Sequence, residues 1–334
     1  IKGPTIQEYD QEGVVAPYNI DPIAQSEGWD KLLDPMIAAV HKCENNSGPY
    51  CAAPVNIHRI DWMWANKAVF DANGISVPTT WDEVNAAAEK LKAAGIIPFA
   101  HGGQAWQDAT VFEAVAMGIG GNNYYKNCYV DLKESCLRSE TTVKVFDQMR
   151  KLQSYTDEGS PGRDWNVATG MVIEGKAGFQ IMGDWAKGEF TAAGKVPGVD
   201  YYCAPTPSNN GYLYNVDSFI FYKTSDPEKQ EGQKLLAKLM MGKNFQKVFN
   251  LYKGSIPARL DVPMDEFDKC AKTSNSDIKT AGASGGLVPS FAHGMAQGNT
   301  MKAALQDIIT EHFNSDMSSV DAANALADSV LANM

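Results

Sequence analysis

The sequence predicts an α/β protein organised in about two domains. Segments with helical periodicity alternate with short apolar segments typical of strands, which indicates helices layered against sheets. The chain has 334 residues, more than one hydrophobic core usually organises. Its composition, 44% hydrophobic and 21% charged, is that of a folded globular protein.

The clearest helix begins after Thr80. Thr80 and Glu83 match a capping box, in which the two residues bond each other's backbone N–H groups. Gly95 ends the helix, and its apolar face consists of Val84, Ala87, Ala88 and Leu91. The following "IIPFAHGG" (96–103) is predicted to be a short buried strand that runs into a glycine turn.

Later segments repeat this alternation. We expect helices over 139–155, 166–174 and 226–241, and strands at "AGFQIM" (177–182) and "DSFIFYK" (217–223). Residues 300–334 are predicted to be helical, with one face formed by Met301, Leu305 and Ile308 and another by Val320, Leu326 and Val330. The glycines of 118–121 follow a helix rather than a strand, so they predict a turn and not a phosphate-binding loop. With two domains, the chain is expected to pass between them more than once.

The six cysteines favour three disulfides. Cys43 and Cys51 bracket "CENNSGPYC", Cys128 and Cys136 bracket "CYVDLKESC" at the same spacing, and Cys203 and Cys270 remain. Metal binding is the alternative, but there is no C-x-x-C and no histidine at ligand spacing from a cysteine. Six cysteines allow 15 pairings, so residue spacing alone leaves the connectivity open. Disulfides indicate an oxidising compartment.

Charge and hydropathy exclude several classes of partner. A net charge of −11 argues against nucleic acid and against an anionic membrane surface, both of which attract basic proteins. No stretch approaches the roughly 18 apolar residues that a membrane-spanning helix needs.

Signatures of catalysis are also missing from the sequence. The five histidines form no zinc motif, and neither a G-x-S-x-G elbow nor a P-loop occurs. We therefore expect no catalytic residue, no metal and no cofactor. A glycoside hydrolase remains the alternative from another class, because it needs only two carboxylates facing each other across a cleft.

The residue types fit a carbohydrate site better. A sugar offers apolar C–H faces and a ring of hydroxyls, which suit aromatic surfaces beside charged or amide groups. Taken singly, a tryptophan is more often core and a loop lysine more often solvated. The candidates are Trp165, Asp184, Trp185 and Asp217, with Lys253 in "YKGSIP" and His293 in "PSFAHGM", each in a short loop.

Longer motifs resemble one protein family across essentially the whole chain. They are "IKGPTIQEY" (1–9), "PVNIHRIDWMWANKAVF" (54–70), "PTTWDEVNAAAEKLKAAGI" (78–96), "PFAHGGQAWQDATVFEAV" (98–115), "GRDWNVATGMVIEGKAGFQIMGDWAK" (162–187), "YNVDSF" (214–219), "KGSIPAR" (253–259) and "AHGMA" (292–296). The sequence resembles the extracellular solute-binding proteins, family 1, of ABC sugar importers. Within them, "GGQAWQD", "GDWAK" and "AHGMA" are similar to the glucose/mannose-type binding proteins of proteobacteria.

The resemblance implies a two-lobed, type II periplasmic-binding-protein fold, each lobe an α/β sandwich. The chain would cross between lobes near 54–59 and 214–219 and form hinge strands there, so that ligand contacts close the lobes. The implied N-terminal lobe comprises 1–56 and 218–254, and the C-terminal lobe 57–217 and 255–334.

The same resemblance implies roles for individual residues. Trp165 and Trp185 resemble aromatic platforms, and Asp217 an acceptor of sugar hydroxyls. Lys253 and His293 resemble hydroxyl donors, and Lys2 reaches the sugar from the first lobe. His58, near the first crossing, is a hinge or contact residue outside this main set.

The implied function is non-enzymatic. The protein would capture a monosaccharide, glucose first, in the periplasm of a Gram-negative cell and deliver it, as a monomer, to the transmembrane subunits of an ABC permease. Another hexose or a short oligosaccharide is the alternative ligand, because a few loop side chains decide the choice.

Two features depart from the family pattern. Family members begin roughly 60 to 70 residues earlier, so we expect the first lobe of this chain to be incomplete and sugar binding by this chain alone to be weak. "CENNSGPYC" and "CYVDLKESC" resemble additions, whereas Cys203 and Cys270 stand where members often carry cysteines. This predicts the pairs Cys43–Cys51, Cys128–Cys136 and Cys203–Cys270.

Overall fold

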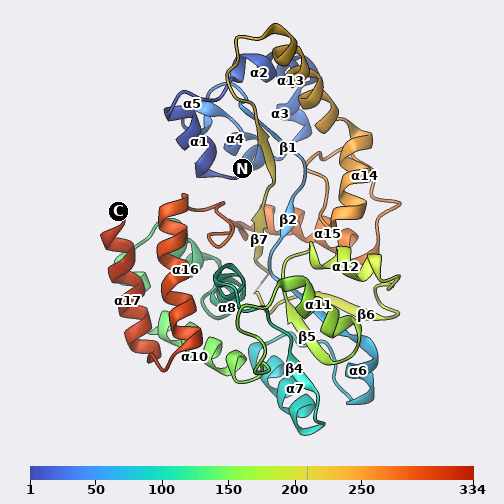
Figure 1. The fold of residues 1–334 in the computed structure, drawn as a ribbon, viewed down its shortest axis with the longest axis vertical. Coiled ribbons are helices and arrows are strands. Elements are labelled where there is room, and N and C mark those ends of the chain that lie inside the picture. Colours follow the sequence, from blue (N-terminus) through green and yellow to red (C-terminus); the bar gives the residue numbers. More distant parts are fainter. Residues whose placement is uncertain (209) are drawn as a thin grey trace.

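The computed structural model describes residues 1–208 and 210–334, without the side chains of 17 and 18. Its elements form two groups, which we call the first and the second lobe, and extended segments run between them (Figure 1). The first lobe holds the chain start, and the second lobe holds the chain end (Figure 1).

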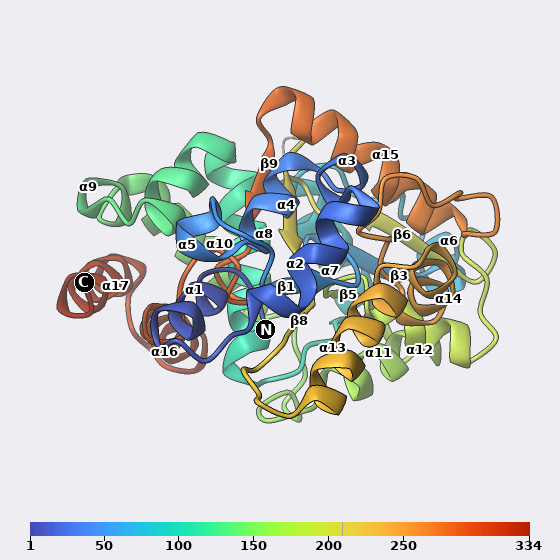
Figure 2. The ribbon, with the colours of Figure 1, turned by 90° about the horizontal axis from the view of Figure 1, so that it is seen from above.

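The first lobe is mostly helical and surrounds a two-stranded sheet. Its elements are α1 (Pro4–Gln11), α2 (Pro17–Glu27), α3 (Trp29–Leu32), α4 (Pro35–Val40), α5 (Cys43–Asn46), β1 (Ala52–Pro54), β8 (Ser218–Ile220), α13 (Pro227–Met240) and α14 (Lys243–Lys253). β1 pairs antiparallel with β8, and α13 packs against α2. Seen from above, α2, β1, β8 and α13 lie together over the second lobe (Figure 2).

The second lobe contains a four-stranded sheet with helices around it. The sheet consists of β3 (Trp62–Asn66), β4 (Ile97–Phe99), β5 (Ala177–Ile181) and β6 (Tyr201–Pro205). A further strand, β9 (Leu287–Pro289), lies outside this sheet and pairs parallel with β7 (Tyr212–Asn215). Its helices are α6 (Lys67–Ala72), α7 (Trp81–Ala93), α8 (Ala105–Tyr125), the π-helix η1 (Lys126–Val130), α9 (Glu134–Leu137), α10 (Glu140–Gln153), α11 (Trp165–Ile173), α12 (Ala186–Ala192), α15 (Lys269–Ser284), α16 (Asn299–Asn314) and α17 (Ser319–Ala332). The sheet order is β4-β5-β3-β6, with β4 and β5 parallel and the other pairs antiparallel.

Three extended segments lie side by side where the lobes meet. β2 (His58–Arg59) continues from β1 and pairs antiparallel with β7 (Tyr212–Asn215), so that His58 stands opposite Asn215. The third segment contains Ile256. It is held to the first by two backbone hydrogen bonds, because Ile57 and Ile256 each donate an N–H to the other's carbonyl. These segments contain the two stretches in which the sequence predicted crossings, 54–59 and 214–219.

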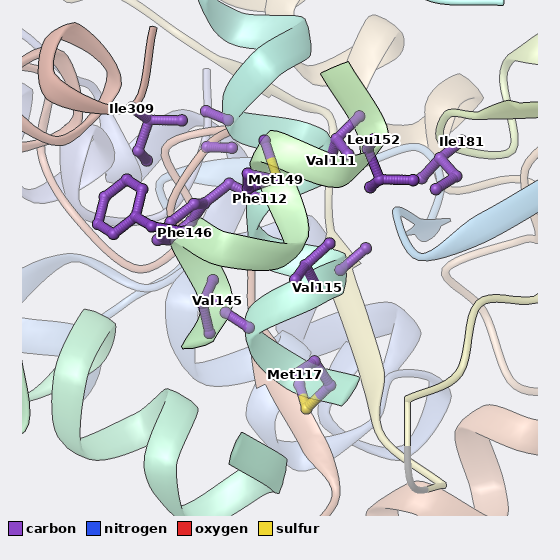
Figure 3. Packing of buried hydrophobic residues seen from close by; sticks show 14 of the residues in the cluster. Val111, Phe112, Val115, Met117, Val145, Phe146, Met149, Leu152, Ile181 and Ile309 are labelled. Atoms are coloured by element: carbon purple, nitrogen blue, oxygen red, sulfur yellow. The ribbon is translucent and has the colours of Figure 1, made fainter. Parts of the chain in front are cut away.

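Helix α8 is the centre of the second lobe. Between Gln107 and Met117 every residue is buried, so this part of the helix has no solvent face and packs on all sides. Val111, Phe112 and Val115 meet Phe146 and Met149 of α10 (Figure 3). Trp106, Thr110 and Glu113 follow one another at helical spacing, so they lie on one face of α8. This single helix therefore supports one wall of the site described below.

The local sequence predictions agree with these elements, with two exceptions. The capping box at Thr80 and Glu83 is present, and the helices predicted from 139, 166 and 226 correspond to α10, α11 and α13. The turn predicted at 118–121 is present in part: residues 118–120 are helical, but the chain leaves helical geometry at Gly121, where φ is 75° and two helical stretches meet in a kink. Val320 is 56% exposed rather than part of an apolar face.

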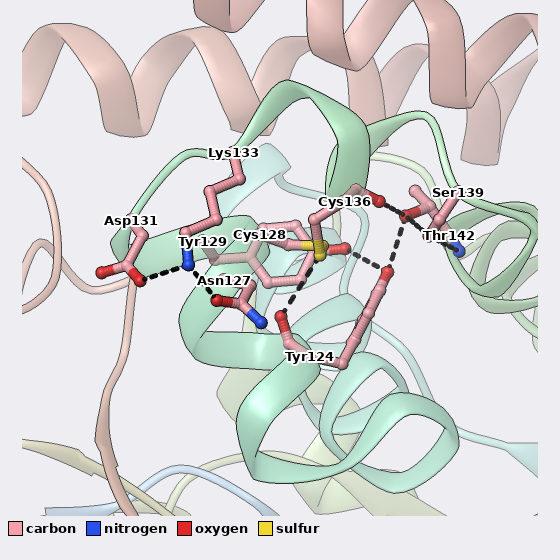
Figure 4. The surroundings of a disulfide bond; sticks show 9 residues. All are labelled: Tyr124, Asn127, Cys128, Tyr129, Asp131, Lys133, Cys136, Ser139 and Thr142. Carbon is pink, nitrogen blue, oxygen red and sulfur yellow. Dashed lines mark hydrogen bonds and ion pairs between the residues drawn. A yellow bond between two sulfur atoms is a disulfide. The ribbon is translucent and has the colours of Figure 1, made fainter.

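The six cysteines form the three pairs expected from the resemblance: Cys43–Cys51, Cys128–Cys136 and Cys203–Cys270. The second pair joins η1 to α9, beside a hydrogen bond between the hydroxyls of Tyr124 and Thr142 (Figure 4). The third pair connects β6 to the first turn of α15 and closes a long loop, since its cysteines have a sequence separation of 67.

Candidate functional site

A cavity of about 500 Å³ lies where the two lobes and the crossing segments meet. All six residues predicted as sugar contacts line it: Lys2, Trp165, Trp185, Asp217, Lys253 and His293. Its volume is within the range of small-molecule sites, and aromatic and charged side chains share its wall. Packing therefore brings together residues from both ends and the middle of the chain.

Trp185 lies at the centre of the aromatic wall. Its ring centroid is 5.0 Å from that of His293, 5.3 Å from His58 and 6.3 Å from Trp106. Gly183 is required two residues earlier, because a Cβ there would lie 2.2 Å from the Trp185 ring. Trp165, the first residue of α11, is half-buried and lines the same cavity.

Asp217 lies on the second crossing, between β7 and β8. Lys2 Nζ is 3.4 Å from its Oδ1, and His58 Nε2 is 3.0 Å from its Oδ2. Burial favours the protonated form of the carboxyl, but the hydrogen bond and charge of His58 and the charge of Lys2 outweigh it and hold the pKa of Asp217 well below its usual range. The carboxylate therefore stays ionised, as an acceptor of hydroxyl hydrogens must.

Lys253 ends α14, and its position depends on the glycine that follows. Gly254 has φ of 93°, and a Cβ there would lie 2.4 Å from the carbonyl oxygen of Asp184. A glycine thus lets the end of α14 approach the loop that carries Trp185. Lys253 is exposed and has no hydrogen bond or ion pair with the described residues, so its ammonium is available to a ligand.

His293 was predicted to donate to sugar hydroxyls, but one of its ring nitrogens already has a partner within the protein. Burial, together with the positive charges of Lys2 and His58, lowers the pKa of His293 well below its usual value, so the ring is neutral. Thr110 donates its single hydroxyl hydrogen to the Trp106 carbonyl at 2.7 Å and accepts from His293 Nε2 at 2.9 Å. A neutral ring that donates through Nε2 keeps Nδ1 as an acceptor.

Asp184, a candidate by residue type, is corrected by the structure. It is 3% exposed and does not line the cavity. One of its carboxylate oxygens contacts His58 Nδ1, and the other accepts the backbone N–H of Arg59 at 3.0 Å. Asp184 supports the cavity from beneath instead of meeting a ligand.

The structure adds lining residues that sequence reasoning missed: Trp106, Glu189, Asn215 and Tyr252. Asn215 is two residues before Asp217, and strand alternation would place both on one face, so this signal was present in "YNVDSF". Its side-chain oxygen is buried without a hydrogen-bond partner among the described atoms, which leaves an acceptor free for a ligand. Trp106 lies in "GGQAWQD", where no periodic pattern separates a site residue from core.

Glu113 holds the loop that carries His293. Ser290 Oγ donates to Glu113 Oε1 at 2.7 Å and accepts the backbone N–H of His293 at 3.1 Å. The carboxyl also accepts from the Tyr125 hydroxyl at 2.9 Å. Burial raises the pKa of Glu113 to about 8.

This pKa predicts a pH effect on stability. Because the folded state binds the Glu113 proton more tightly than the unfolded state, the free energy of unfolding is expected to fall as pH rises from about 4.5 through about 8. Glu113→Gln is expected to lose less stability than the unmodified protein between pH 6 and pH 9, measured by urea unfolding. Glu134→Gln, at an exposed carboxylate, serves as the control. Parallel profiles for all three proteins would contradict the prediction.

A second cavity, of about 460 Å³, lies beside α15 and is lined by Thr79, Thr206 and Thr280. Its buried cation, Arg59, already pairs with Asp61 at 3.1 Å and with Asp277 at 2.6 Å. No aromatic side chain is among its described lining residues. This cavity therefore lacks the aromatic surface and the available charges of the first.

The described part of the chain contains neither a metal-binding cluster nor a membrane-spanning helix. No group of three or more His, Cys, Asp or Glu side chains is placed to hold a metal ion. No described helix is both long and apolar enough to cross a membrane.

Two lobes, joined by crossing strands and enclosing a cavity between them, define a ligand-binding protein. The family model described as bacterial extracellular solute-binding protein matches residues 2–240. The chain belongs to this family, and it is therefore a binding component of transport rather than an enzyme. The two-lobed type II fold predicted from the resemblance is confirmed.

Relatives and solved structures agree with this assignment. A "probable sugar-binding periplasmic protein" of Brucella suis is 44% identical over 97% of this chain and 76% of its own length. One with the same description from Rhizobium meliloti is 44% identical over 97% and 77%. The crystal structure of the solute receptor AcbH, described as preferring β-D-galactopyranose, superposes with a TM-score of 0.81 at 18% identity, over 99% of this chain and 83% of that one. Maltose-bound MalE3 of T. maritima gives 0.77 at 18% identity, over 98% and 82%.

Proposed function

We propose that this protein binds a monosaccharide, with glucose as the first candidate, in the 500 Å³ cavity and delivers it to an ABC importer. The observation that carries the proposal is the convergence of three tryptophans, Trp106, Trp165 and Trp185, with charged groups and a free amide oxygen in one cavity. Relatives 44% identical are described as sugar-binding and periplasmic, which supports a carbohydrate ligand and a periplasmic location in a Gram-negative cell.

Each group has a distinct part in this proposal. Trp165 and Trp185 receive the apolar faces of the sugar, and Lys253 donates to hydroxyl oxygens. Asp217, Asn215 and the neutral His293 ring accept hydroxyl hydrogens, since each offers an acceptor atom. Lys2, which pairs with Asp217, contributes from the first lobe.

Closure follows from where these residues lie. We propose that 1–56 and 218–254 move as one body against 57–217 and 255–334. Lys2 and Lys253 belong to the first body and the tryptophans to the second, so a bound sugar favours the closed arrangement by contacting both. In that arrangement a monomer would dock on the transmembrane subunits of the permease.

A short oligosaccharide is the second candidate ligand. A neighbouring cavity of about 360 Å³ shares Lys2, Trp106 and His293 with the first. It adds polar side chains at Thr5, Asn299, Lys302 and Gln306. A second sugar ring would have both space and hydrogen-bonding partners there.

A screen of sugars tests the proposal directly. A panel of glucose, mannose, galactose, xylose and maltose, each added up to tens of millimolar, is expected to contain a sugar that raises the melting temperature. Ligand at 100 times its Kd stabilises the native state by about 2.7 kcal/mol. Calorimetric titration then measures the affinity, and a panel without any shift or heat would reject a sugar ligand.

Asp217→Asn is the sharpest single change for this test. It keeps the shape of the side chain but replaces a charged acceptor by a neutral amide, so affinity is expected to fall roughly 10- to 100-fold, the value of a charge-assisted hydrogen bond. Asp328→Asn, at an exposed ion pair with Arg138, should bind like the unmodified protein. Equal affinity in the Asp217 variant would remove this residue from the site.

A further inference from the structure

His58 is almost fully buried in the wall of the cavity, with a carboxylate at each ring nitrogen. Nδ1 contacts Asp184 Oδ1, and Nε2 lies 3.0 Å from Asp217 Oδ2. An ionised carboxylate can only accept a hydrogen bond. Both ring nitrogens must therefore carry hydrogen for both contacts to form, which makes the ring a charged imidazolium.

Other polar and charged groups also surround His58. Lys2 reaches the far oxygen of Asp217, while the neutral His293 lies across the Trp185 ring. The Asn56 amide nitrogen lies 2.9 Å from His58 Nε2 and donates to Asp217 Oδ2 at 3.0 Å, so with the charged ring both nitrogens donate to the same carboxylate oxygen. Arg59, the next residue, has its guanidinium paired with other carboxylates, those of Asp61 and Asp277.

These surroundings set the direction in which the ring titrates. Burial of the ring lowers the pKa of His58, but the charges and hydrogen bonds of Asp184 and Asp217 outweigh it and raise the pKa above the usual value. Without its proton at Nε2 the ring could donate to Asp184 only. Nε2 would then accept from the Asn56 amide, and Asp217 would face a lone pair instead of a donor.

We propose that His58 is a positioning residue for sugar binding: as an imidazolium it holds Asp217 in the orientation that accepts sugar hydroxyls. The inference rests on the proposed function. Asp184 follows β5 in the second lobe, and Asp217 lies on the second crossing, between β7 and β8. The proton on His58 therefore also ties the second crossing to the second lobe, and sugar affinity depends on it.

The experiment measures the Kd of the tightest sugar from pH 6 to pH 9. In the unmodified protein Kd is expected to rise about tenfold as pH passes the raised pKa of His58, because binding favours the protonated ring. His58→Gln should bind at least tenfold more weakly at pH 6 and lose this pH dependence. His312→Gln, at another buried histidine that does not line the cavity, should keep the profile of the unmodified protein.

A second measurement determines directly whether the ring nitrogens of His58 are protonated. In protein with 15N-labelled histidine, both ring nitrogens of His58 are expected to be protonated at pH 7.5, identified by the signal that disappears in His58→Gln. A single unprotonated nitrogen at that pH would overturn the inference, as would a sugar Kd that does not change with pH. If the unmodified protein binds no sugar at any pH, the proposed function fails first and the positioning role with it.

Discussion

Trp185→Ala is expected to weaken sugar binding roughly 30- to 1000-fold, the effect of losing about 2 to 4 kcal/mol from an aromatic contact at the centre of a site. The ring lies between those of Trp106, His58 and His293, so its removal opens the aromatic wall of the cavity at its middle. Because the ring is only half-buried, the melting temperature of the unliganded variant should fall by only a few degrees. Calorimetric titration and thermal unfolding of the same preparation measure the two effects.

Trp185→Phe provides the matched control. Phenylalanine keeps a flat apolar face, so this variant should recover most of the affinity that alanine loses. A large loss of unliganded stability in Trp185→Ala, with little change in affinity once the protein is folded, would show that Trp185 is core rather than site.

Replacing both Cys203 and Cys270 by alanine is expected to lower the free energy of unfolding by about 4 kcal/mol, because the lost disulfide no longer restricts a loop of this length in the unfolded chain. The bond is also the covalent connection between β6 and α15, which carries Asp277 and leads to β9. Denaturant unfolding under non-reducing conditions measures the loss.

The two short disulfides serve as the comparison. Each spans eight positions, so its removal is expected to cost about 2.5 kcal/mol on the same loop-length argument. The double alanine variants at 43 and 51, and at 128 and 136, should therefore be more stable than the variant at 203 and 270. The reverse order would show that native-state contacts, not loop length, dominate these bonds.

Local structure was predictable because its signals are local. The α7 helix follows from the Thr80–Glu83 capping box and an apolar face of four residues, all of which are buried in the structure. The glycines of 118–121 predicted a turn, and helical geometry does break there, at Gly121. The sequence did not show that the chain resumes helical geometry after the break and continues into η1.

The candidate site, in contrast, was not predictable from local signals. Trp165 and Trp185 were more probable as core than as site from residue type, and only the family resemblance placed them at a cavity. Asp184 has the same residue type as Asp217, yet it is buried under His58 while Asp217 faces the cavity. Residue type and spacing do not distinguish these two carboxylates, because the groups that distant segments bring around each of them make the difference.

The sequence by itself determined the α/β class, most helices and strands, the oxidised cysteines and, through its motifs, the family. The tertiary structure decided which of these residues share one cavity and what each can do there. Lys2, Asp217 and His293 meet only because β2 pairs with β7 and α8 supports the loop after β9. The roles that we propose for His58, as a charged ring between two carboxylates, and for His293, as a neutral acceptor, rest on contacts between segments far apart in the chain. Periodicity records which face of an element is buried, whereas the protonation of a buried ring depends on the groups that distant elements bring to it.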